Sequence, residues 1–222
     1  MILDRPSSAG AAVAERLGPS VRFCAGDVTS EPDAVAAVKT AVEAFGGLSI
    51  LVNCAGIGIP RRILGRDGLL PLDEFRHVIE VNLVGTFNVL RHAARQMSES
   101  EPVGGERGVI VNTASVAAFD GQIGQASYTS SKAAIVGLTL VAARELGSRL
   151  IRCCTIAPGI MDTPLLGTLS QEIRASLAAM VPHPARLGQP YEYALLAAHI
   201  VENGYLNGAT IRLDGAIRMA PR

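Results

Sequence analysis

The segment GVIVNTASVAAFDGQIGQASYTSSKAAIVGLTL, residues 108–140, decides the fold of this chain. It begins with the apolar run GVIVNTA, which predicts a strand, and it leads into a helix predicted from Ser127 to about Leu146. A loop that contains Gly121 and Gly124 separates the two elements. A strand followed by a helix of this length is the repeating unit of proteins whose parallel sheet is covered by helices on both faces.

The same alternation extends from this segment toward both ends of the chain. Strands are predicted for residues 1–4, 21–28, 48–56, 108–115, 151–159 and 207–216, and the runs 48–56 and 151–159 are typical of strands buried on both faces. Helices are predicted for residues 7–18, 31–47, 72–98, 127–146, 171–180 and 190–202. Residues 58–71 are predicted as a surface loop and residues 104–108 as a flexible turn. The pattern predicts an α/β fold, a doubly wound parallel sheet in a single domain that spans residues 1–222.

Composition is that of an ordinary globular protein. Of the 222 residues, 49% are hydrophobic, enough for one sizeable core, and 20 basic residues balance 20 acidic ones. A balanced charge gives no broad attraction to nucleic acid or to an anionic membrane, so we expect neither as a partner. The sequence has no long uncharged apolar run and begins without the cationic and apolar pattern of a secretory signal, so we expect a cytoplasmic protein.

The cysteines and histidines lack the spacing of metal ligands. Cys24, Cys54, Cys153 and Cys154 lie in or beside predicted strands without a CxxC arrangement, so we expect buried thiols rather than disulfides or a metal site. The four histidines show no HExxH-like grouping. We therefore predict no metal.

Three side chains of the opening segment form a candidate proton-transfer group. Tyr128 and Lys132 are four residues apart and share one face of the predicted helix, while Ser115 follows the strand. A free tyrosine has a pKa of about 10, and a nearby ammonium that brings it near 7 must supply about 4 kcal/mol of differential interaction. Ser115 would hold a substrate oxygen while Tyr128 exchanges its proton. The alternative is a solvated helix face, where tyrosine and lysine often have this spacing.

Five short motifs follow one another in order along the chain. They are NCAG at 53–56, VNLVGTFN at 81–88, NTAS at 112–115, YTSSK at 128–132 and APGIMDTP at 157–164. Together they resemble the short-chain dehydrogenase/reductase family, and the resemblance covers all 222 residues. It implies a Rossmann-type fold and the transfer of a hydride between a nicotinamide cofactor and a secondary alcohol, which forms a ketone.

Longer segments narrow this resemblance to one subgroup of the family. TASVAAFDGQIGQASY, TIAPGIMDTPLL and LNGATIRLDGAIRM are similar to members that act on 3-hydroxyacyl-CoA or on hydroxysteroids, as in fatty acid metabolism. The resemblance also implies a homotetramer, with subunit contacts through the helices around Val84 to Leu90 and Ile135 to Leu146 and through the C-terminal segment. Residues 58–71 and the segment after Thr163 would determine which acyl chain or steroid is preferred. The sequence of these two segments does not identify that substrate.

The resemblance assigns roles to the catalytic and substrate-binding side chains. Ser115 would orient the substrate oxygen, Tyr128 would act as acid and base, and Lys132 would lower its pKa while it binds the nicotinamide ribose. Asn82 matches the asparagine that holds a water near the lysine for proton relay; without the resemblance, a buried amide at a helix kink explains it equally well. Gln122 and Gln125 face the substrate or, alternatively, only satisfy the backbone of their loop.

A second set of positions is assigned to the cofactor. Asp4 matches the acidic residue that binds the adenosine ribose and repels a 2′-phosphate, which implies NAD rather than NADP. Otherwise Asp4 is a helix cap, and Arg5 beside it leaves some tolerance for NADP. The remaining assigned positions are Asp27 and Val28 at the adenine, Asn53, Cys54, Ala55 and Gly56 along the dinucleotide, Pro158 and Gly159 at the carboxamide, and Met161 and Thr163 just beyond it.

One segment that the resemblance leads us to expect is missing. Family members begin with a strand and a TGxxxGxG turn that holds the pyrophosphate, whereas Met1 here begins inside what would be the second strand. In the strand order 3-2-1-4-5-6-7 the missing first strand is central, so we expect two unpaired sheet edges. Either the start site was assigned too late, or the chain is a truncated product that binds NAD poorly. The second explanation carries an alternative function, a non-catalytic remnant that acts as an interaction subunit.

Overall fold

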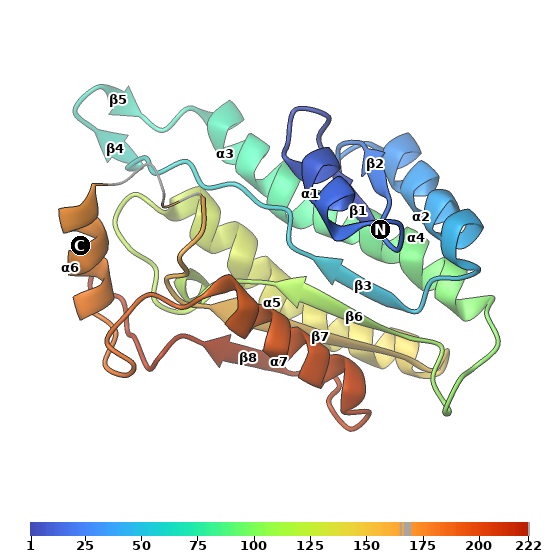
Figure 1. The fold of residues 1–222 in the computed structure, drawn as a ribbon. Helices are drawn as coiled ribbons and strands as arrows, with labels where there is room; N and C mark the ends of the chain where they lie inside the picture. Colours follow the sequence, from blue (N-terminus) through green and yellow to red (C-terminus); the bar gives the residue numbers. More distant parts are fainter. Residues whose placement is uncertain (165, 167–169, 222) are drawn as a thin grey trace.

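The computed structural model describes residues 1–164, 166 and 170–221, and strands and helices alternate along the chain as predicted (Figure 1). The strands are β1 Ile2–Asp4, β2 Phe23–Ala25, β3 Ile50–Asn53, β4 Leu64–Gly65, β5 Gly68–Leu69, β6 Gly108–Thr113, β7 Ile151–Pro158 and β8 Thr210–Leu213. The helices are α1 Gly10–Leu17, α2 Glu31–Phe45, α3 Leu72–Ile79, α4 Thr86–Ser98, α5 Ala126–Gly147, α6 Gln171–Ala179 and α7 Pro190–Glu202. A π-helical turn spans Glu80–Gly85, and a 3-10 turn spans Val116–Ala118.

Four parallel strands form the main sheet in the order β3-β6-β7-β8. β6 pairs with β7 along its whole length, from Gly108 beside Ile151 to Thr113 beside Ile156. β1 and β2 form a separate parallel pair with Ile2 beside Phe23. The predicted α/β fold with a parallel sheet is confirmed, and among the described residues β1 and β2 do not pair with the main sheet.

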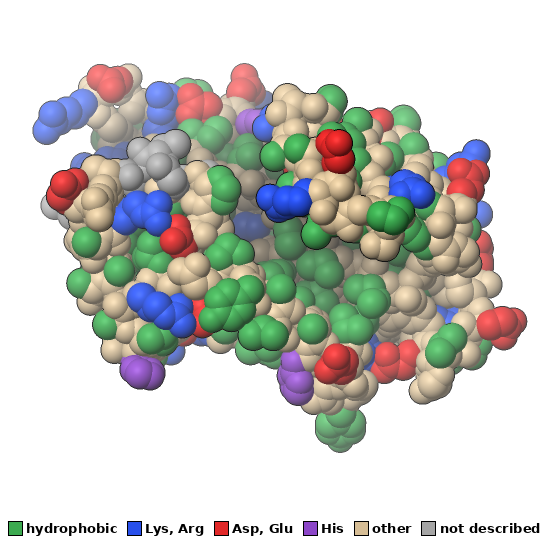
Figure 2. Space-filling view, in the orientation of Figure 1, with side chains coloured by type: hydrophobic (Ala, Val, Ile, Leu, Met, Phe, Trp, Pro, Cys, Tyr) green, Lys and Arg blue, Asp and Glu red, His purple; other side chains and the backbone are tan. Residues whose placement is uncertain are grey.

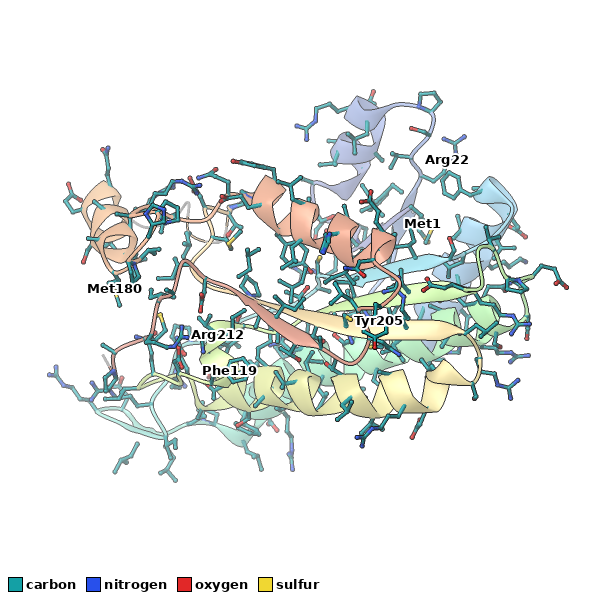
Figure 3. All side chains as sticks on the ribbon, turned by 90° about the horizontal axis from the view of Figure 1, so that it is seen from below. Met1, Arg22, Phe119, Met180, Tyr205 and Arg212 are labelled. Atoms are coloured by element: carbon teal, nitrogen blue, oxygen red, sulfur yellow. The ribbon has the colours of Figure 1, made fainter. Side chains whose placement is uncertain are left out.

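Alternate residues of the central strands face two different layers of helices. Ile110 of β6 packs with Leu90 and Met97 of α4, whereas Val111 packs with Ile200 of α7. Figure 3 shows α5 on one side of the sheet and α7 on the other. Because both faces of β6 and β7 are covered, their sequences are nearly continuous apolar runs rather than alternating ones.

A cavity of about 640 Å³ lies between the edges of β1 and β3. Small side chains of α2 and α4, including Ala37, Ala41 and Ala93, form part of its wall, and Figure 2 shows the surface hollowed beside the N-terminal elements. Among the residues that the structure describes, none forms a strand between these edges. Ile50 and Val52 of β3 are therefore 45% and 40% exposed, so the prediction that residues 48–56 are buried on both faces is wrong.

Two predicted elements differ from the structure in detail. The helix predicted for residues 72–98 consists of α3, the π-helical turn and α4 in succession. The loop predicted for residues 58–71 contains the short antiparallel pair β4 and β5, which are joined by a turn at Arg66 and Asp67. Gly68, the first residue of β5, has a φ of 110°. A π-helical turn adds one residue to a helix, and two-residue strands are too short to show an alternating pattern, so neither feature has a sequence signal.

The prediction of four buried thiols is only half right. Cys153 and Cys154 in β7 are buried, but Cys24 is partly exposed and Cys54, just beyond the end of β3, is exposed. All four are free thiols. In the described part of the chain there is no cluster of three or more potential metal ligands, and no helix there has the length and apolar character needed to cross a bilayer.

β6 passes close to its neighbours at Gly108. A Cβ there would lie 2.5 Å from the Met97 sulfur and 2.9 Å from the Ser49 carbonyl oxygen, which is held by a hydrogen bond from the Val109 N–H. We expect Gly108→Ala to lower the free energy of unfolding by about 1 to 3 kcal/mol in a denaturant titration. Gly47→Ala is the matched control, because a Cβ there meets nothing within 4 Å; equal losses in the two variants would contradict this explanation.

Candidate active site

The carboxyl ends of β3, β6 and β7 meet at one edge of the sheet, which is where open α/β sheets bind their ligands. Residues just beyond these strands, with α5 and the C-terminal segment, line a cavity of about 520 Å³. The predicted site residues in its wall are Cys54, Gly56, Ser115, Gln122, Gln125, Tyr128, Lys132, Pro158, Gly159, Met161 and Thr163. Folding thus gathers most of the predicted positions around one cavity.

Lys132 reaches from α5 to the end of β6. Its Nζ donates a hydrogen bond of 2.9 Å to the Thr113 carbonyl oxygen and lies 5.8 Å from the centre of the Tyr128 ring. The residue is only 4% exposed. The structure therefore places Tyr128 and Lys132 on one face of α5, as their spacing predicts, and that face points into the protein rather than to solvent.

Burial controls the protonation of both side chains. Loss of water around the ammonium lowers the pKa of Lys132 to about 8. Burial raises the pKa of Tyr128, and the Ser115 hydroxyl opposes this shift in part. The predicted lowering of the Tyr128 pKa by Lys132 is therefore not found in the chain by itself, because desolvation of the phenol dominates.

Ser115 lies two residues beyond the end of β6 and directly precedes the 3-10 turn. Its Oγ accepts a hydrogen bond of 3.1 Å from the Ala117 N–H, and its side chain lies in the wall of the cavity. A hydroxyl that accepts from the backbone still has its own proton to donate. Ser115 can thus hold an oxygen atom that enters the cavity beside Tyr128.

Asn82 joins the π-helical turn to the backbone that follows β3. Its Oδ1 accepts from the Ile57 N–H at 2.8 Å, and its Nδ2 donates to the Ile57 carbonyl and to Ser131 Oγ, both at 2.9 Å. Ser131 in turn donates to the Tyr128 carbonyl at 2.7 Å. These contacts agree with a buried amide at a helix irregularity, and the water that Asn82 would hold near Lys132 stays a prediction.

Several positions assigned to the cofactor lie at the larger cavity between β1 and β3. Asp4, Val28, Asn53, Cys54 and Ala55 line it. Asp4 Oδ1 accepts from the Arg5 N–H at 2.7 Å, and α1 has Ala9 rather than Asp4 as its N-cap. Asp27 is fixed by hydrogen bonds from Thr29, which lower the pKa of its carboxyl. Cys54 lines both cavities, so the two are neighbours.

The two predicted cofactor glycines are required for different reasons. A Cβ at Gly56 would lie 3.2 Å from Lys132 Nζ and 3.3 Å from Asn82 Oδ1, so the missing side chain leaves space in front of the lysine. A Cβ at Gly159 would lie 2.9 Å from the Cα of Asp214, so this glycine is needed for packing between the ends of β7 and β8. The space at Gly56 agrees with its predicted place along the dinucleotide, which stays a prediction.

Gln122 and Gln125 lie in the cavity wall, but their amides bind protein groups. Gln125 Nε2 donates to Gln122 Oε1 at 3.1 Å, and Gln122 Nε2 donates to the Ala220 carbonyl at 2.9 Å. The pair thereby holds its loop against the C-terminal segment. This geometry agrees with the alternative that the sequence left open, and substrate contact by either glutamine stays a prediction.

Sequence reasoning missed two residues beside Lys132. Thr113 acts through its backbone carbonyl, which every residue possesses, so its side chain gives no signal of this contact. Tyr193 lies 80 residues further along, in α7, and its Oη is 2.7 Å from Thr113 Oγ1. No sequence spacing connects two elements so far apart.

Part of the segment predicted to set specificity, residues 165 and 167–169, lies outside the described residues.

Comparison with known proteins agrees with this geometry. Residues 1–174 match the family described as short chain dehydrogenase. The chain belongs to the short-chain dehydrogenase family. It is 53% identical to the 3-hydroxyacyl-CoA dehydrogenase type-2 of Bos taurus, over 100% of this chain and 86% of the relative, and 52% identical to the Drosophila melanogaster protein of that name, over 100% and 88%. The crystal structure of 3-hydroxyacyl-CoA dehydrogenase type-2 from Mycobacterium avium is 43% identical, with a TM-score of 0.95 over 100% of this chain and 86% of that chain.

The resemblance predicted from the motifs is thus confirmed, and the protein is an oxidoreductase of the short-chain dehydrogenase type. Dehydrogenases of this family generally use NAD or NADP, and the residues present fit the nicotinamide end of such a cofactor. An ammonium has three N–H donors, and the hydrogen bond to Thr113 uses one of those of Lys132. The others are available to ribose hydroxyls in the space that Gly56 leaves open.

Lys132 provides a direct test of how strongly the site is desolvated. The chain contains two lysines, Lys39 and Lys132, so lysine-selective NMR can resolve both side chains. We expect Lys132 to titrate near pH 8, because burial lowers its pKa, and the exposed Lys39 provides the internal reference. A midpoint of 10.5, the ordinary lysine value, would contradict the assigned burial.

The same shift predicts how stability depends on pH. Because the folded pKa of Lys132, about 8, lies below the ordinary value of 10.5, the unfolded chain binds more protons between these pH values. The contribution of Lys132 to the free energy of unfolding should therefore rise from about pH 8 toward pH 10.5. Lys132→Met should lose this part of the pH dependence in denaturant titrations.

Proposed function

We propose that this short-chain dehydrogenase oxidises the 3-hydroxyl group of a 3-hydroxyacyl-CoA to a ketone with NAD as the hydride acceptor. The observation that carries the proposal is the placement of Ser115, Tyr128 and Lys132 in the wall of one cavity at the carboxyl edge of the sheet. The substrate class is supported by relatives at 53% and 52% identity, whose names state 3-hydroxyacyl-CoA dehydrogenase.

Each of the three side chains has a separate task in this reaction. Ser115 orients the substrate oxygen through its hydroxyl group. Tyr128, as phenolate, takes the alcohol proton while the hydrogen on the carbinol carbon leaves as hydride, and accepting that hydride is the chemistry that bound NAD supplies. Lys132 favours the phenolate through its positive charge, a contribution that must outweigh the burial of Tyr128. The products are a ketone, reduced cofactor and a proton that passes from Tyr128 to solvent.

The cavity wall suits a substrate with a long apolar part. Its apolar members include Ile57, Ile59, Pro60, Ile160, Leu166 and Met219. Such a wall can bury an acyl chain and would also accept the rings of a hydroxysteroid, the second substrate class that the sequence implies. Comparing kcat/KM for 3-hydroxyacyl-CoA thioesters of increasing length with that for a hydroxysteroid distinguishes the two.

We also propose that the enzyme is a homotetramer assembled through α4 and α5. Phe87, Leu138 and Val141 line a groove of about 590 Å³ between these helices, and Phe87 and Val141 are 48% and 51% exposed. Both helices overlap the ranges that the sequence predicts as subunit contacts, Val84 to Leu90 and Ile135 to Leu146. The alternative function as a non-catalytic interaction subunit has no such support, because Ser115, Tyr128 and Lys132 lie together in the wall of one cavity.

Tyr128→Phe tests the proposed reaction most directly. Loss of the proton acceptor should lower kcat by about 100- to 10,000-fold with a 3-hydroxyacyl-CoA and NAD, while the affinity for NADH stays nearly unchanged. Turnover is followed by absorbance of reduced nicotinamide and affinity by its fluorescence. Tyr205→Phe is the control, since Tyr205 is 100% exposed. An equal loss of turnover and NADH binding in the Tyr128 variant would contradict the role given to its hydroxyl.

Asp4→Ser tests the choice of NAD over NADP. Asp4 is exposed at the end of β1 and would repel a 2′-phosphate, so its replacement should raise kcat/KM for NADP relative to NAD by about tenfold or more. Asp73→Asn, which removes a carboxylate with 94% side-chain exposure, is the control for a general change in charge. An unchanged NADP to NAD ratio in the Asp4 variant would exclude this role.

A further inference from the structure

A chain of hydroxyl groups links helix α7 to the catalytic edge of the sheet. Tyr193 Oη lies 2.7 Å from Thr113 Oγ1, and Thr113 Oγ1 donates to the Asn53 carbonyl at 2.6 Å. The three residues belong to α7, β6 and β3, which are distant in sequence but meet here (Figure 1). Cys54 completes the cluster, with its sulfur 3.9 Å from Tyr193 Oη and 3.8 Å from Thr113 Oγ1.

The chemistry of the groups fixes the direction of this chain. A threonine hydroxyl has one proton, and that of Thr113 is donated to the Asn53 carbonyl. Thr113 Oγ1 must therefore accept from Tyr193, whose phenol is the donor. Burial raises the pKa of Tyr193, so the phenol keeps its proton across the pH range in which Lys132 titrates. The donor role of Tyr193 is thus constant while the site changes its charge.

Thr113 is also the residue to which Lys132 donates its hydrogen bond. Its carbonyl accepts the hydrogen bond from Lys132 Nζ, and the next N–H, of Ala114, donates to the Ile156 carbonyl of β7 at 2.8 Å. The last peptide of β6 is therefore held toward β7 by its backbone and toward β3 by the Thr113 hydroxyl. Tyr193 stabilises the second of these links.

We propose that Tyr193 is a positioning residue that acts through Thr113 on two parts of the cofactor site, Lys132 and the backbone of residues 54–56. The first effect passes through the Thr113 carbonyl, and the second through the Asn53 carbonyl, which directly precedes Cys54. Tyr193 lines neither cavity and touches none of the predicted reacting groups. Its effect on the cofactor rests on the proposed function, whereas its effect on Lys132 does not.

Apolar packing does not require the hydroxyl group of Tyr193. Tyr193 packs against a core cluster that includes Val111, Ile156 and Ile200, and a phenylalanine ring would make the same apolar contacts. The oxygen extends beyond this cluster to the carboxyl end of β6. Tyr193→Phe therefore removes the proposed interaction while it retains the apolar contacts.

The first experiment needs neither cofactor nor turnover. A carbonyl acceptor favours the charged form of Lys132, so a less well fixed acceptor should lower its pKa further. We expect Tyr193→Phe to shift the NMR titration midpoint of Lys132 downward by about half a unit, because the Thr113 carbonyl that accepts from Lys132 is then less well fixed. Tyr191→Phe, on the same helix and 60% exposed, should leave the midpoint unchanged.

The second experiment measures how the substitution changes cofactor binding and turnover. Tyr193→Phe should raise the Kd for NADH and the KM for NAD about fivefold, shift the pH profile of kcat/KM in the direction of the Lys132 midpoint, and change kcat at saturating NAD little. Thr113→Val removes the intermediate hydroxyl but retains the β-branched shape. Because Tyr193 acts through that hydroxyl, the variant with both substitutions should bind NADH as tightly as the variant with Thr113→Val alone.

The outcomes separate this proposal from the proposed function. If wild-type protein neither binds NADH nor turns over, the proposed function fails, and the Lys132 midpoint still decides the role of Tyr193. If the Lys132 midpoint is the same in the wild type and in the Tyr193 variant, the positioning role is overturned. Additive effects of Tyr193→Phe and Thr113→Val would overturn the route through Thr113.

Discussion

The burial of one ammonium group is the constraint on which this site depends. Lys132 extends from α5 to the end of β6, where a single backbone carbonyl, that of Thr113, accepts its described hydrogen bond. A charge with so little water around it is expensive to maintain, and its pKa falls accordingly. Strongly perturbed groups of this kind gather at functional sites. The cavity in front of Lys132 is where a ligand with hydroxyl groups would replace the lost water.

The elements around Lys132 are held by polar contacts rather than by apolar packing alone. The π-helical turn directs the fully buried amide of Asn82 at the backbone of Ile57 and at Ser131, and Ser131 binds the carbonyl of Tyr128. The irregular turn thus connects the end of β3 to the first turn of α5. Such turns in helices frequently occur at functional sites, and here the turn contacts α5, the helix that carries Tyr128 and Lys132.

The strands of the fold differ in how closely the surrounding residues pack against them. Fully buried residues such as Met97, Ile110 and Ile200 lie in the layers around β6 and β7, whereas β1 and β3 border a large cavity. Parallel strands are normally covered on both faces and paired at both edges, so Ile50 and Val52 are exposed in an unusual position. The candidate active-site cavity lies beside the ends of β6 and β7, whereas Asp4, the acidic residue that the sequence assigns to the adenosine ribose, lies at the larger cavity.

The sequence by itself determined the order of strands and helices, the α/β class and the set Ser115, Tyr128 and Lys132. Apolar runs, helix periodicity and an interval of four residues are local properties of the chain, so they can be read without coordinates. Only the tertiary structure decided that burial raises the pKa of Tyr128, that β3 has an exposed edge, and that Tyr193 reaches Thr113 across 80 residues. Burial and contacts between distant elements depend on how the layers pack, and no short stretch of sequence contains that information.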